Sequence, residues 1–310
     1  ERLLSAGTEA RIGVSKCSVS ILFCDIDGFE EACHGIRPHE VVNMLSTVIG
    51  VIADIIENRG GTLLEFIGDE VLAVFNTPIA VKFHIYSAVA ASCEIHKAMA
   101  ELPPFMTESD YGEREVPIRC RCGLHTAQIL AGNIGSTERM KYGLLGDGTN
   151  LTARLKGLNS RYGTYTLASQ HMHEDKLCRR IFVFRPVDMV AVKGKKEPTC
   201  VYEVVDRLED GNEALAKAAL EHARAFELYY SKNFAEAKEL FQQVCVAFEA
   251  NSHQRDEVSR QLIARCDDYL LRPPPEDWDG VERLTKKTFV VKPVDQAAPD
   301  RTATSVKTNL

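Results

Sequence analysis

The sequence contains no long run of basic residues, and its formal net charge is −7. Surfaces that bind nucleic acid or anionic membranes are usually rich in clustered Lys and Arg, so the composition disfavours both partners. No uninterrupted segment approaches the roughly 20 apolar residues of a membrane-spanning helix, and no secretory signal is present. We therefore expect a cytoplasmic chain that makes no membrane contact itself.

The cysteine patterns of zinc ribbons and redox motifs are also absent. Ten cysteines occur, and the pair Cys120 and Cys122 is separated by a single residue, which fits neither pattern. Without a secretory signal, this composition predicts reduced thiols, most of them buried. The chain begins at Glu1 rather than Met, which predicts a piece of a longer protein with a sensor or membrane anchor upstream.

Two carboxylates lie at the ends of predicted strands. The apolar run 19–23 predicts a buried strand with Asp25 at its tip, while 62–67 and 70–75 predict a hairpin with Asp69 in its two-residue turn. If the strands are neighbours, the two aspartates supply hard oxygen ligands suited to Mg²⁺ that carries a nucleoside triphosphate. An aspartate in such a position more often caps a strand or forms a turn, so neither residue alone establishes a metal site.

Two further segments offer groups that suit phosphates. Residues 146–149 would begin a helix on which Asn150 and Arg154, four residues apart, share one face. Lys193 follows a predicted strand in the basic segment 192–196. An amide, a guanidinium and an ammonium suit a triphosphate and a transition state that gains charge. Taken alone, each segment is better explained by a helix cap with a surface ion pair or by a solvated basic turn.

Six motifs together resemble the catalytic domain of class III nucleotidyl cyclases, the adenylate and guanylate cyclases. They extend from about Ser18 to Val205 and comprise the strand end 23–29, the hairpin 65–70, Gly-Leu-His-Thr at 123–126, Ala-Gly-Asn-Ile-Gly at 131–135, Gly-Asp-x-x-Asn-x-x-x-Arg at 146–154, and Val-Lys-Gly-Lys at 192–195 with Val-Tyr-Glu-Val at 201–204. Six matches in this order are not expected by chance.

The resemblance implies an α/β (α+β) fold, a ferredoxin-like domain that works as a head-to-tail homodimer with catalytic sites across the interface. It also implies an enzyme that converts GTP or ATP to a 3′,5′-cyclic nucleotide and pyrophosphate for signal transduction. In one subunit Asp25, Asp69 and the carbonyl of Ile26 would hold two Mg²⁺ (or Mn²⁺) ions.

The other subunit would contribute the groups that contact the substrate. The resemblance assigns catalytic roles to Asn150 at the ribose and to Arg154 at the α-phosphate, places Lys193 at the γ-phosphate, and adds Phe29 to the substrate-binding residues. No side chain is an obvious general base. His125 lies on a predicted strand in a pattern that favours a buried or hydrogen-bonded role.

Two positions are expected to contact the base. Glu65 stands where adenylate cyclases of this class carry Lys and guanylate cyclases carry Glu, and Gly143 stands where Asp or Thr reads adenine and Cys reads guanine. The pair predicts a slight preference for GTP over ATP, with an adenylate cyclase of atypical base pocket as the alternative.

Two other functions remain open. A diguanylate cyclase or polymerase on a related fold is disfavoured because the Gly-Gly-Asp-Glu-Phe hairpin is missing. A catalytically inactive regulatory module is disfavoured because both metal aspartates and the Asn150–Arg154 pair are retained.

At 310 residues the chain exceeds one average domain. The predicted organisation is a polar lead-in at 1–17, the cyclase domain at 18–206, a helical accessory segment at 207–291 and a disordered tail at 292–310. Within the domain, helices are expected at 38–58, 81–100 and 147–160, and strands at 116–126, 165–168, 181–192 and 199–205, with a loop at 102–115. The accessory segment predicts a helical hairpin, 212–231 and 234–251, which must pack on the domain or its dimer mate because one hairpin cannot bury its own apolar face.

Overall fold

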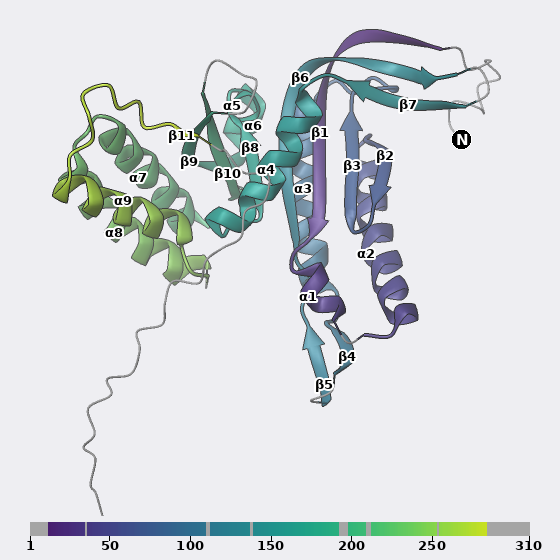
Figure 1. Cartoon of the computed structure of the whole chain (residues 1–310), viewed down its shortest axis with the longest axis horizontal. Coiled ribbons are helices and arrows are strands. Elements are labelled where there is room, and N and C mark those ends of the chain that lie inside the picture. The colour runs from purple at the N-terminus through teal and green to yellow at the C-terminus, as the bar shows by residue number, and fades with distance from the viewer. Residues whose placement is uncertain are drawn as a thin grey trace, which may run out of the picture.

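The computed structural model describes residues 12–34, 36–109, 112–136, 139–191, 198–208, 212–252 and 254–283. Its strands are β1 (Gly13–Ile26), β2 (Thr62–Ile67), β3 (Glu70–Phe75), β4 (Phe105–Ser109), β5 (Gly112–Val116), β6 (Cys120–Gly135), β7 (Met140–Leu145), β8 (Thr166–Ser169), β9 (Phe182–Ala191), β10 (Thr199–Arg207) and β11 (Glu282–Arg283). Its helices are α1 (Phe29–Cys33), α2 (Pro38–Asn58), α3 (His84–Glu101), α4 (Gly148–Tyr162), α5 (Gln170–His173), α6 (Lys176–Ile181), α7 (Glu213–Tyr230), α8 (Phe234–Ser252) and α9 (Glu257–Leu271). The main sheet has the order β11-β9-β10-β8-β6-β1-β3-β2, with β7 paired to β6, and β4 pairs with β5 separately (Figure 1).

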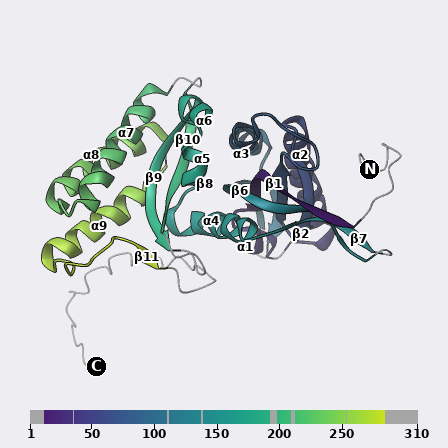
Figure 2. The same ribbon diagram turned by 90° about the horizontal axis from the view of Figure 1, so that it is seen from above.

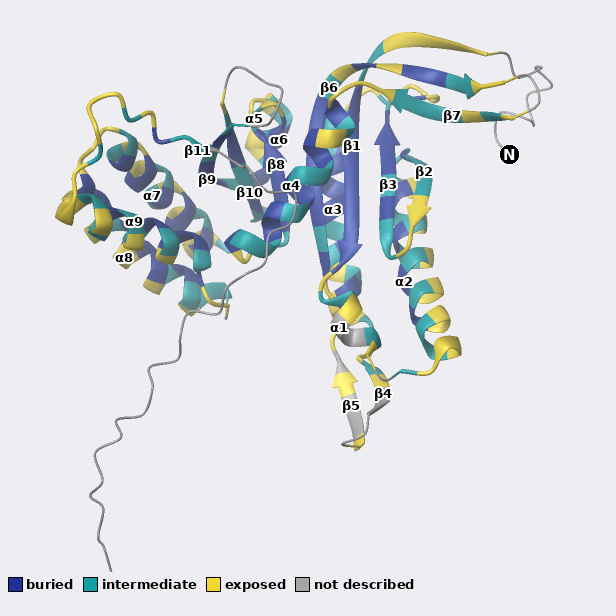
Figure 3. Cartoon of the chain, in the orientation of Figure 1, coloured by how far each residue is buried: buried dark blue, intermediate teal, exposed yellow. Residues whose placement is uncertain are grey.

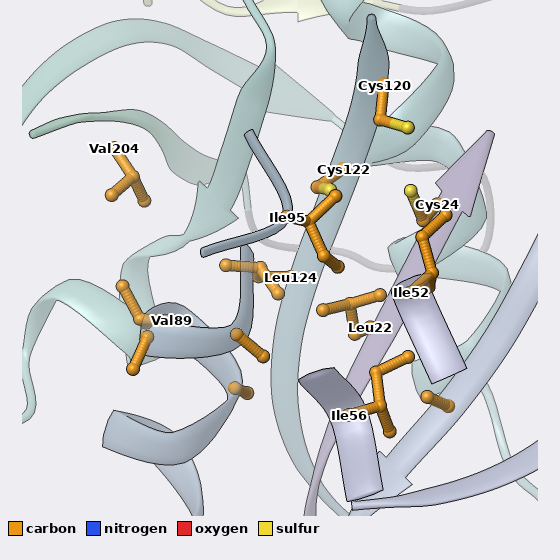
Figure 4. Packing of buried hydrophobic residues seen from close by; sticks show 14 of the residues in the cluster. Leu22, Cys24, Ile52, Ile56, Val89, Ile95, Cys120, Cys122, Leu124 and Val204 are labelled. Atoms are coloured by element: carbon orange, nitrogen blue, oxygen red, sulfur yellow. The ribbon is translucent and has the colours of Figure 1, made fainter. Parts of the chain in front are cut away.

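Strand β1 lies near the middle of the sheet and directs side chains to both of its faces. It pairs antiparallel with β6 along its whole length and with β3 over its second half. Because successive side chains of a strand point to opposite faces, Leu22 and Cys24 enter the core beneath α2 and α3. Figure 4 shows both residues in that core together with Ile52 of α2 and Ile95 of α3. Asp25 therefore lies on the opposite face, which α4 covers.

Helix α4 packs directly on β6 at Gly123. A Cβ atom at this position would lie 2.4 Å from the main-chain nitrogen of Lys156 and 2.4 Å from the carbonyl oxygen of Thr152. Only a residue without a side chain permits so close an approach of two backbones. Asn159 then donates from Nδ2 to the carbonyl oxygen of Cys122 (2.9 Å), which holds the second half of α4 on the strand.

Helices α7, α8 and α9 lie beyond β9, on the far side of the sheet from α2 (Figures 1 and 2). Asp188 of β9 is fully buried and accepts hydrogen bonds from the Tyr162 hydroxyl of α4 (2.6 Å) and from Arg265 Nη2 of α9 (2.8 Å). Gln261 of α9 donates to the carbonyl oxygen of Arg161 (2.6 Å). Because the buried Asp188 carboxylate needs these partners, the contacts hold α7, α8 and α9, the helical unit, in one position against the C-terminal end of α4.

Helix α2 is long and apolar enough to cross a membrane by length and composition alone. Its residues Met44, Val48, Ile52 and Ile56 are buried against the sheet, and its outer face is exposed (Figure 3). A helix that covers the core of a globular domain passes the same test, so this is weak evidence for a membrane span. Helix α2 is therefore an exception to the expectation that no segment is long and apolar enough to span a membrane.

Several expected elements occur as predicted. The hairpin strands β2 and β3 and the helix α2 have the predicted bounds, and α4, α7 and α8 differ from theirs by at most two residues. All ten cysteines are unpaired and seven are buried, as predicted. The aromatic side chain of the only tryptophan, Trp278, stacks on Tyr230.

Other expectations were wrong. Strand β1 begins at Gly13, inside the expected lead-in, and β4 and part of β5 occupy the expected loop 102–115. Strand β6 continues to Gly135 and pairs with β7, although neither the extension nor β7 was predicted, and helix α9 was also missed. The added lengths of β1 and β6 depend on their mutual pairing, which joins residues as distant as Gly13 and Asn133 and is not contained in a local pattern. Strands β4–β5 and β6–β7 are hairpins between neighbouring segments, and their local turns were overlooked. The predicted disordered tail lies outside the described residues.

Candidate active site

Asp25 lies next to the end of β1 and only 6% of its surface is exposed. Its cross-strand neighbour on β6 is Arg121. Arg121 donates from Nε to Asp25 Oδ1 (3.0 Å) and from Nη2 to Asp25 Oδ2 (2.9 Å), a bidentate ion pair. The guanidinium also reaches Asp27 Oδ1 (3.4 Å) and donates to the Ser160 hydroxyl. The strand-end carboxylate is therefore held in one orientation.

Asp69 lies beside it, in the turn between β2 and β3. Its Oδ2 accepts a hydrogen bond from the main-chain nitrogen of Ile26 (3.3 Å), the residue that follows Asp25, so the two predicted metal aspartates both lie at the end of β1. Burial raises the pKa of the Asp69 carboxyl, and the negative charge of Asp25 raises it further. The structure thus brings together Asp25, Ile26 and Asp69, the three expected metal ligands.

A second cation contacts Asp25 from α4. Lys156 is 9% exposed, and its Nζ donates to Asp25 Oδ2 (2.9 Å) and to Glu70 Oε1 (2.6 Å). The ammonium also lies 5.6 Å from the centroid of the Phe23 ring. Burial alone would lower the pKa of Lys156, but the charges of Asp25 and Glu70 outweigh it and raise this pKa. Lys156 is therefore an ammonium ion between two carboxylates.

The residues present fit divalent cations in donor type. Two carboxylates and a main-chain carbonyl are the hard oxygen ligands that Mg²⁺ prefers, and the mutual repulsion of Asp25 and Asp69 favours a cation between them. Across the described ranges, no group of three or more His, Cys, Asp or Glu side chains is arranged to hold a metal, but the expected ligand set needs only two. Asp25 Oδ2 accepts hydrogen bonds from both Arg121 and Lys156, so an ion that binds through this oxygen has to displace one of these donors.

The two expected base-contacting positions lie on neighbouring parts of the fold. Glu65 of β2 accepts a hydrogen bond from Lys141 Nζ of β7 (2.6 Å); the Lys141 side chain is exposed and that of Glu65 is partly exposed. Gly143 lies two residues further along β7, on the same face as Lys141. A Cβ atom at Gly143 would lie 3.1 Å from the side-chain atom Cδ1 of Ile134, so a small side chain fits after a slight shift of Ile134.

Asn150 and Arg154 lie on the N-terminal half of α4, away from the metal aspartates of their own chain. A helix turns about 100° per residue, so these two residues share a face, whereas Arg154 and Lys156 point roughly 200° apart. Lys156 is buried against Asp25, while Asn150 is exposed and Arg154 is partly exposed. Neither Asn150 nor Arg154 makes a side-chain hydrogen bond or ion pair within the part of the chain that the structure describes.

The remaining predicted site residues have different surroundings. Phe29 begins α1 and packs, partly buried, on the core beneath α2 and α3. His125 is 2% exposed, and its Nδ1 forms a hydrogen bond with the Ser169 hydroxyl (2.8 Å), as the strand pattern predicted. Lys193 lies outside the described residues.

Arg121, Lys156, Glu70 and Lys141 were missed from the sequence. Lys156 had a detectable signal, because it interrupts the apolar stripe of α4 that contains Leu155 and other buried residues. A lysine at a core position of an amphipathic helix requires a buried acidic partner. The other three required knowledge of which strands are neighbours.

Residues 14–204 match the family described as the adenylate and guanylate cyclase catalytic domain. The chain is 32% identical over 187 residues to adenylate cyclase 1 of Rhizobium meliloti (strain 1021), a match that covers 60% of this chain and 27% of that protein. It is 28% identical over 193 residues to an adenylate cyclase of Anabaena cylindrica and covers 36% of that protein. The chain thus spans roughly a quarter to a third of the length of these relatives.

Two solved structures have a similar fold. The guanylyl cyclase Cya2 superposes with a TM-score of 0.52 at 30% identity and covers 65% of this chain and 98% of its own. The adenylyl cyclase CyaB from P. aeruginosa superposes with a TM-score of 0.53 at 25% identity and covers 63% of this chain and 97% of its own. These likenesses confirm the predicted fold class.

Proposed function

Because the chain belongs to the adenylate and guanylate cyclase catalytic-domain family, we propose that it converts a nucleoside triphosphate to its 3′,5′-cyclic monophosphate and pyrophosphate. The observation that carries this proposal is the placement of Asp25 and Asp69 together at the end of β1, where Asp69 accepts a hydrogen bond from the Ile26 main-chain nitrogen. The retained pair Asn150 and Arg154 on α4 supplies the second half of the chemistry.

In the proposed reaction, the ribose 3′-oxygen attacks the α-phosphorus in line, the bond from that phosphorus to the β-phosphate bridging oxygen breaks, and the hydroxyl proton passes to solvent. Two divalent ions, Mg²⁺ or Mn²⁺, would supply Lewis-acid chemistry at the 3′-oxygen and the phosphates. Asp25 and Asp69 would hold them together with the Ile26 carbonyl. Arg154 would stabilise the charge that develops on the α-phosphate, and Asn150 would orient the ribose. Lys193 remains our candidate for the γ-phosphate, and Phe29 for the substrate-binding wall.

We propose that two copies of the chain form each site. The face of α4 with Asn150 and Arg154 and the face with Lys156 point in nearly opposite directions, and Lys156 contacts the Asp25 of its own chain. One chain therefore cannot direct both sets of groups at one nucleotide without refolding. A symmetric dimer with two equivalent composite sites meets this requirement.

We propose GTP as the slightly preferred substrate. The Glu65 carboxylate would accept hydrogen bonds from N1–H and the 2-amino group of guanine, and the neighbouring Lys141 ammonium would donate to O6. Adenine also offers a donor at its 6-amino group and an acceptor at N1, so the same pair would accept ATP in another orientation. The preference for GTP should therefore be modest.

A second candidate function, an inactive regulatory module, is favoured by one observation. Arg121 and Lys156 together contact both oxygens of Asp25, which is also what a purely structural buried carboxylate would show.

The reduced state of the ten cysteines and the use of nucleoside triphosphates fit a cytoplasmic location, which is part of the proposal.

Product identification distinguishes these functions. The purified chain is incubated with ATP or GTP and with Mg²⁺ or Mn²⁺, and the products are identified by mass spectrometry. A 3′,5′-cyclic nucleotide from either substrate supports the cyclase. A dimeric chain that yields no cyclic product with any combination supports the regulatory module.

A further inference from the structure

The ammonium of Lys156 lies between the carboxylate of Asp25, an expected metal ligand, and that of Glu70, the residue next to the other expected ligand, Asp69. Its Nζ is 2.9 Å from Asp25 Oδ2 and 2.6 Å from Glu70 Oε1. The side chain is only 11% exposed, so the contact with Asp25 is shielded from bulk water and its electrostatic attraction is stronger than that of a surface pair. The backbone contact at Gly123 fixes α4 against β6 and delivers Lys156 to this point.

Asp25 has no oxygen free of cationic contacts. Arg121 donates to both of its oxygens, and Lys156 donates to one of them. A divalent ion that approached this carboxylate would meet two positive side chains whose nitrogens lie 2.9–3.0 Å from its oxygens, and like charges at such short range repel strongly. Oδ2 accepts hydrogen bonds from both cations, so one of them must withdraw before an ion can bind through this oxygen.

Lys156 is the side chain able to withdraw. Arg121 is held by its bidentate pair with Asp25, by Asp27 and by the Ser160 hydroxyl. Lys156 has a flexible four-carbon stem, and Glu70 offers it a partner other than Asp25. The ammonium can therefore leave Asp25 and keep one ion pair.

We propose that Lys156 is a built-in competitor of the divalent cation, which bridges Asp25 and Glu70 in the metal-free chain and keeps only its pair with Glu70 when the ion binds. This inference rests on the proposed function, because it takes Asp25 as a metal ligand. Lys156 thereby lowers the affinity of the site for its metal without itself contacting the nucleotide. The chain then loads metal only at concentrations high enough to displace the ammonium.

Metal affinity without nucleotide tests this proposal independently of catalysis. Mn²⁺ is titrated into the whole chain, and free Mn²⁺ is followed by electron paramagnetic resonance. In Lys156→Met, which removes the ammonium, the dissociation constant for Mn²⁺ should fall on the order of tenfold or more, since a hydrogen bond to a charged group no longer has to be broken. Lys156→Gln, which keeps a polar side chain, should show the same direction and serves if the Met variant does not fold.

The matched control is Lys238→Met. Lys238 also pairs with a carboxylate, Asp267 at 2.6 Å, but it lies in the helical unit, and its removal changes the net charge by the same amount. Its Mn²⁺ affinity should equal that of the wild type. An equal gain in both variants would attribute the effect to net charge and overturn the proposal.

Asp25→Asn separates failure of this inference from failure of the proposed function. If Asp25→Asn abolishes Mn²⁺ binding while Lys156→Met leaves the dissociation constant unchanged or raises it, the metal site stands and the competitor role is wrong. If Asp25→Asn binds Mn²⁺ as the wild type does, the metal assignment is wrong and the inference falls with it.

Discussion

A Cβ atom on Gly123 would lie 2.4 Å from the main-chain nitrogen of Lys156, so β6 and α4 touch through their backbones at this point. This contact sets the distance between the sheet and α4. One face of α4 directs Lys156 toward Asp25, and the opposite face directs Arg154 away from the sheet. The geometry of the candidate site therefore depends on a residue that carries no functional group.

The replacement Gly123→Ala should destabilise the chain. Its methyl group has to displace backbone atoms rather than the end of a side chain, and such overpacking costs about 1–3 kcal/mol in the free energy of unfolding. Urea denaturation measures the change. Gly157→Ala on the same helix is the control, because its Cβ would meet nothing within 4 Å, and it should leave stability unchanged or raise it by up to about 1 kcal/mol. Equal stability of the Gly123→Ala variant and the wild type would contradict the proposed contact.

The two metal aspartates should differ in their effect on stability. Asp69→Asn replaces a carboxylate whose Oδ2 accepts a hydrogen bond from an uncharged donor, the Ile26 main-chain nitrogen, so activity should be lost while the fold persists. Asp25→Asn should also abolish activity, but it leaves Arg121 and Lys156 without their shared counter-charge and should cost about 3 kcal/mol. Activity assays and urea denaturation of both variants measure the two effects.

The double variant Asp25→Asn with Lys156→Met checks this explanation. Removal of one of the two cations that lose Asp25 as counter-charge should recover part of the stability lost in Asp25→Asn, as measured by urea denaturation. A double variant less stable than Asp25→Asn would show that Lys156 stabilises the fold by some other contact.

Base preference should depend on Glu65 and its partner. We expect the wild type to have a modestly higher kcat/KM for GTP than for ATP. Glu65→Lys combined with Gly143→Asp should shift the ratio toward ATP, because these side chains donate to N1 and accept from the 6-amino group of adenine. Lys141→Met should weaken the preference by removing the donor to O6, a contact worth about 1–3 kcal/mol. A wild type that clearly prefers ATP, or a ratio that none of these changes moves, would show that Glu65 does not read the base.

Acid should destabilise the attachment of the helical unit through His222. This residue is fully buried, forms hydrogen bonds with the Pro186 carbonyl oxygen (2.9 Å) and the Ser259 hydroxyl (3.2 Å), and burial lowers its pKa to about 3. The unfolded chain binds a proton near pH 6.5, so the stability from neutral His222 is complete above that pH and falls as the pH drops toward 3. Between pH 7 and pH 5 this amounts to about 2 kcal/mol.

Unfolding free energies of the wild type and His222→Gln at several pH values measure this contribution. The variant should be less stable at pH 7 but should lose less stability on acidification. Parallel pH profiles for the two proteins would contradict the assignment.

Much of the fold and half of the site follow from the sequence. The position of Asp25 is encoded locally by the apolar run that precedes it, and that of Asp69 by its hairpin turn, so local patterns were enough to locate both. The ion pairs that surround Asp25 could not be located in this way, because they depend on the register of β1 with β6 and on how closely α4 packs on β6 at Gly123. The extension of β6 was missed for the same reason, because it pairs with the start of β1, far away in the sequence. Strand β7 forms a hairpin with β6, and that local turn was overlooked.

The central claim is that each catalytic site combines the aspartates of one chain with Asn150 and Arg154 of another. Differently tagged Asp69→Asn and Arg154→Ala chains are coexpressed, and the heterodimer is isolated by both tags in sequence. Each parent variant alone should be inactive, and the heterodimer should regain about half of the wild-type activity per dimer because one of its two sites carries no substitution. A pure heterodimer no more active than its parents would contradict the shared site.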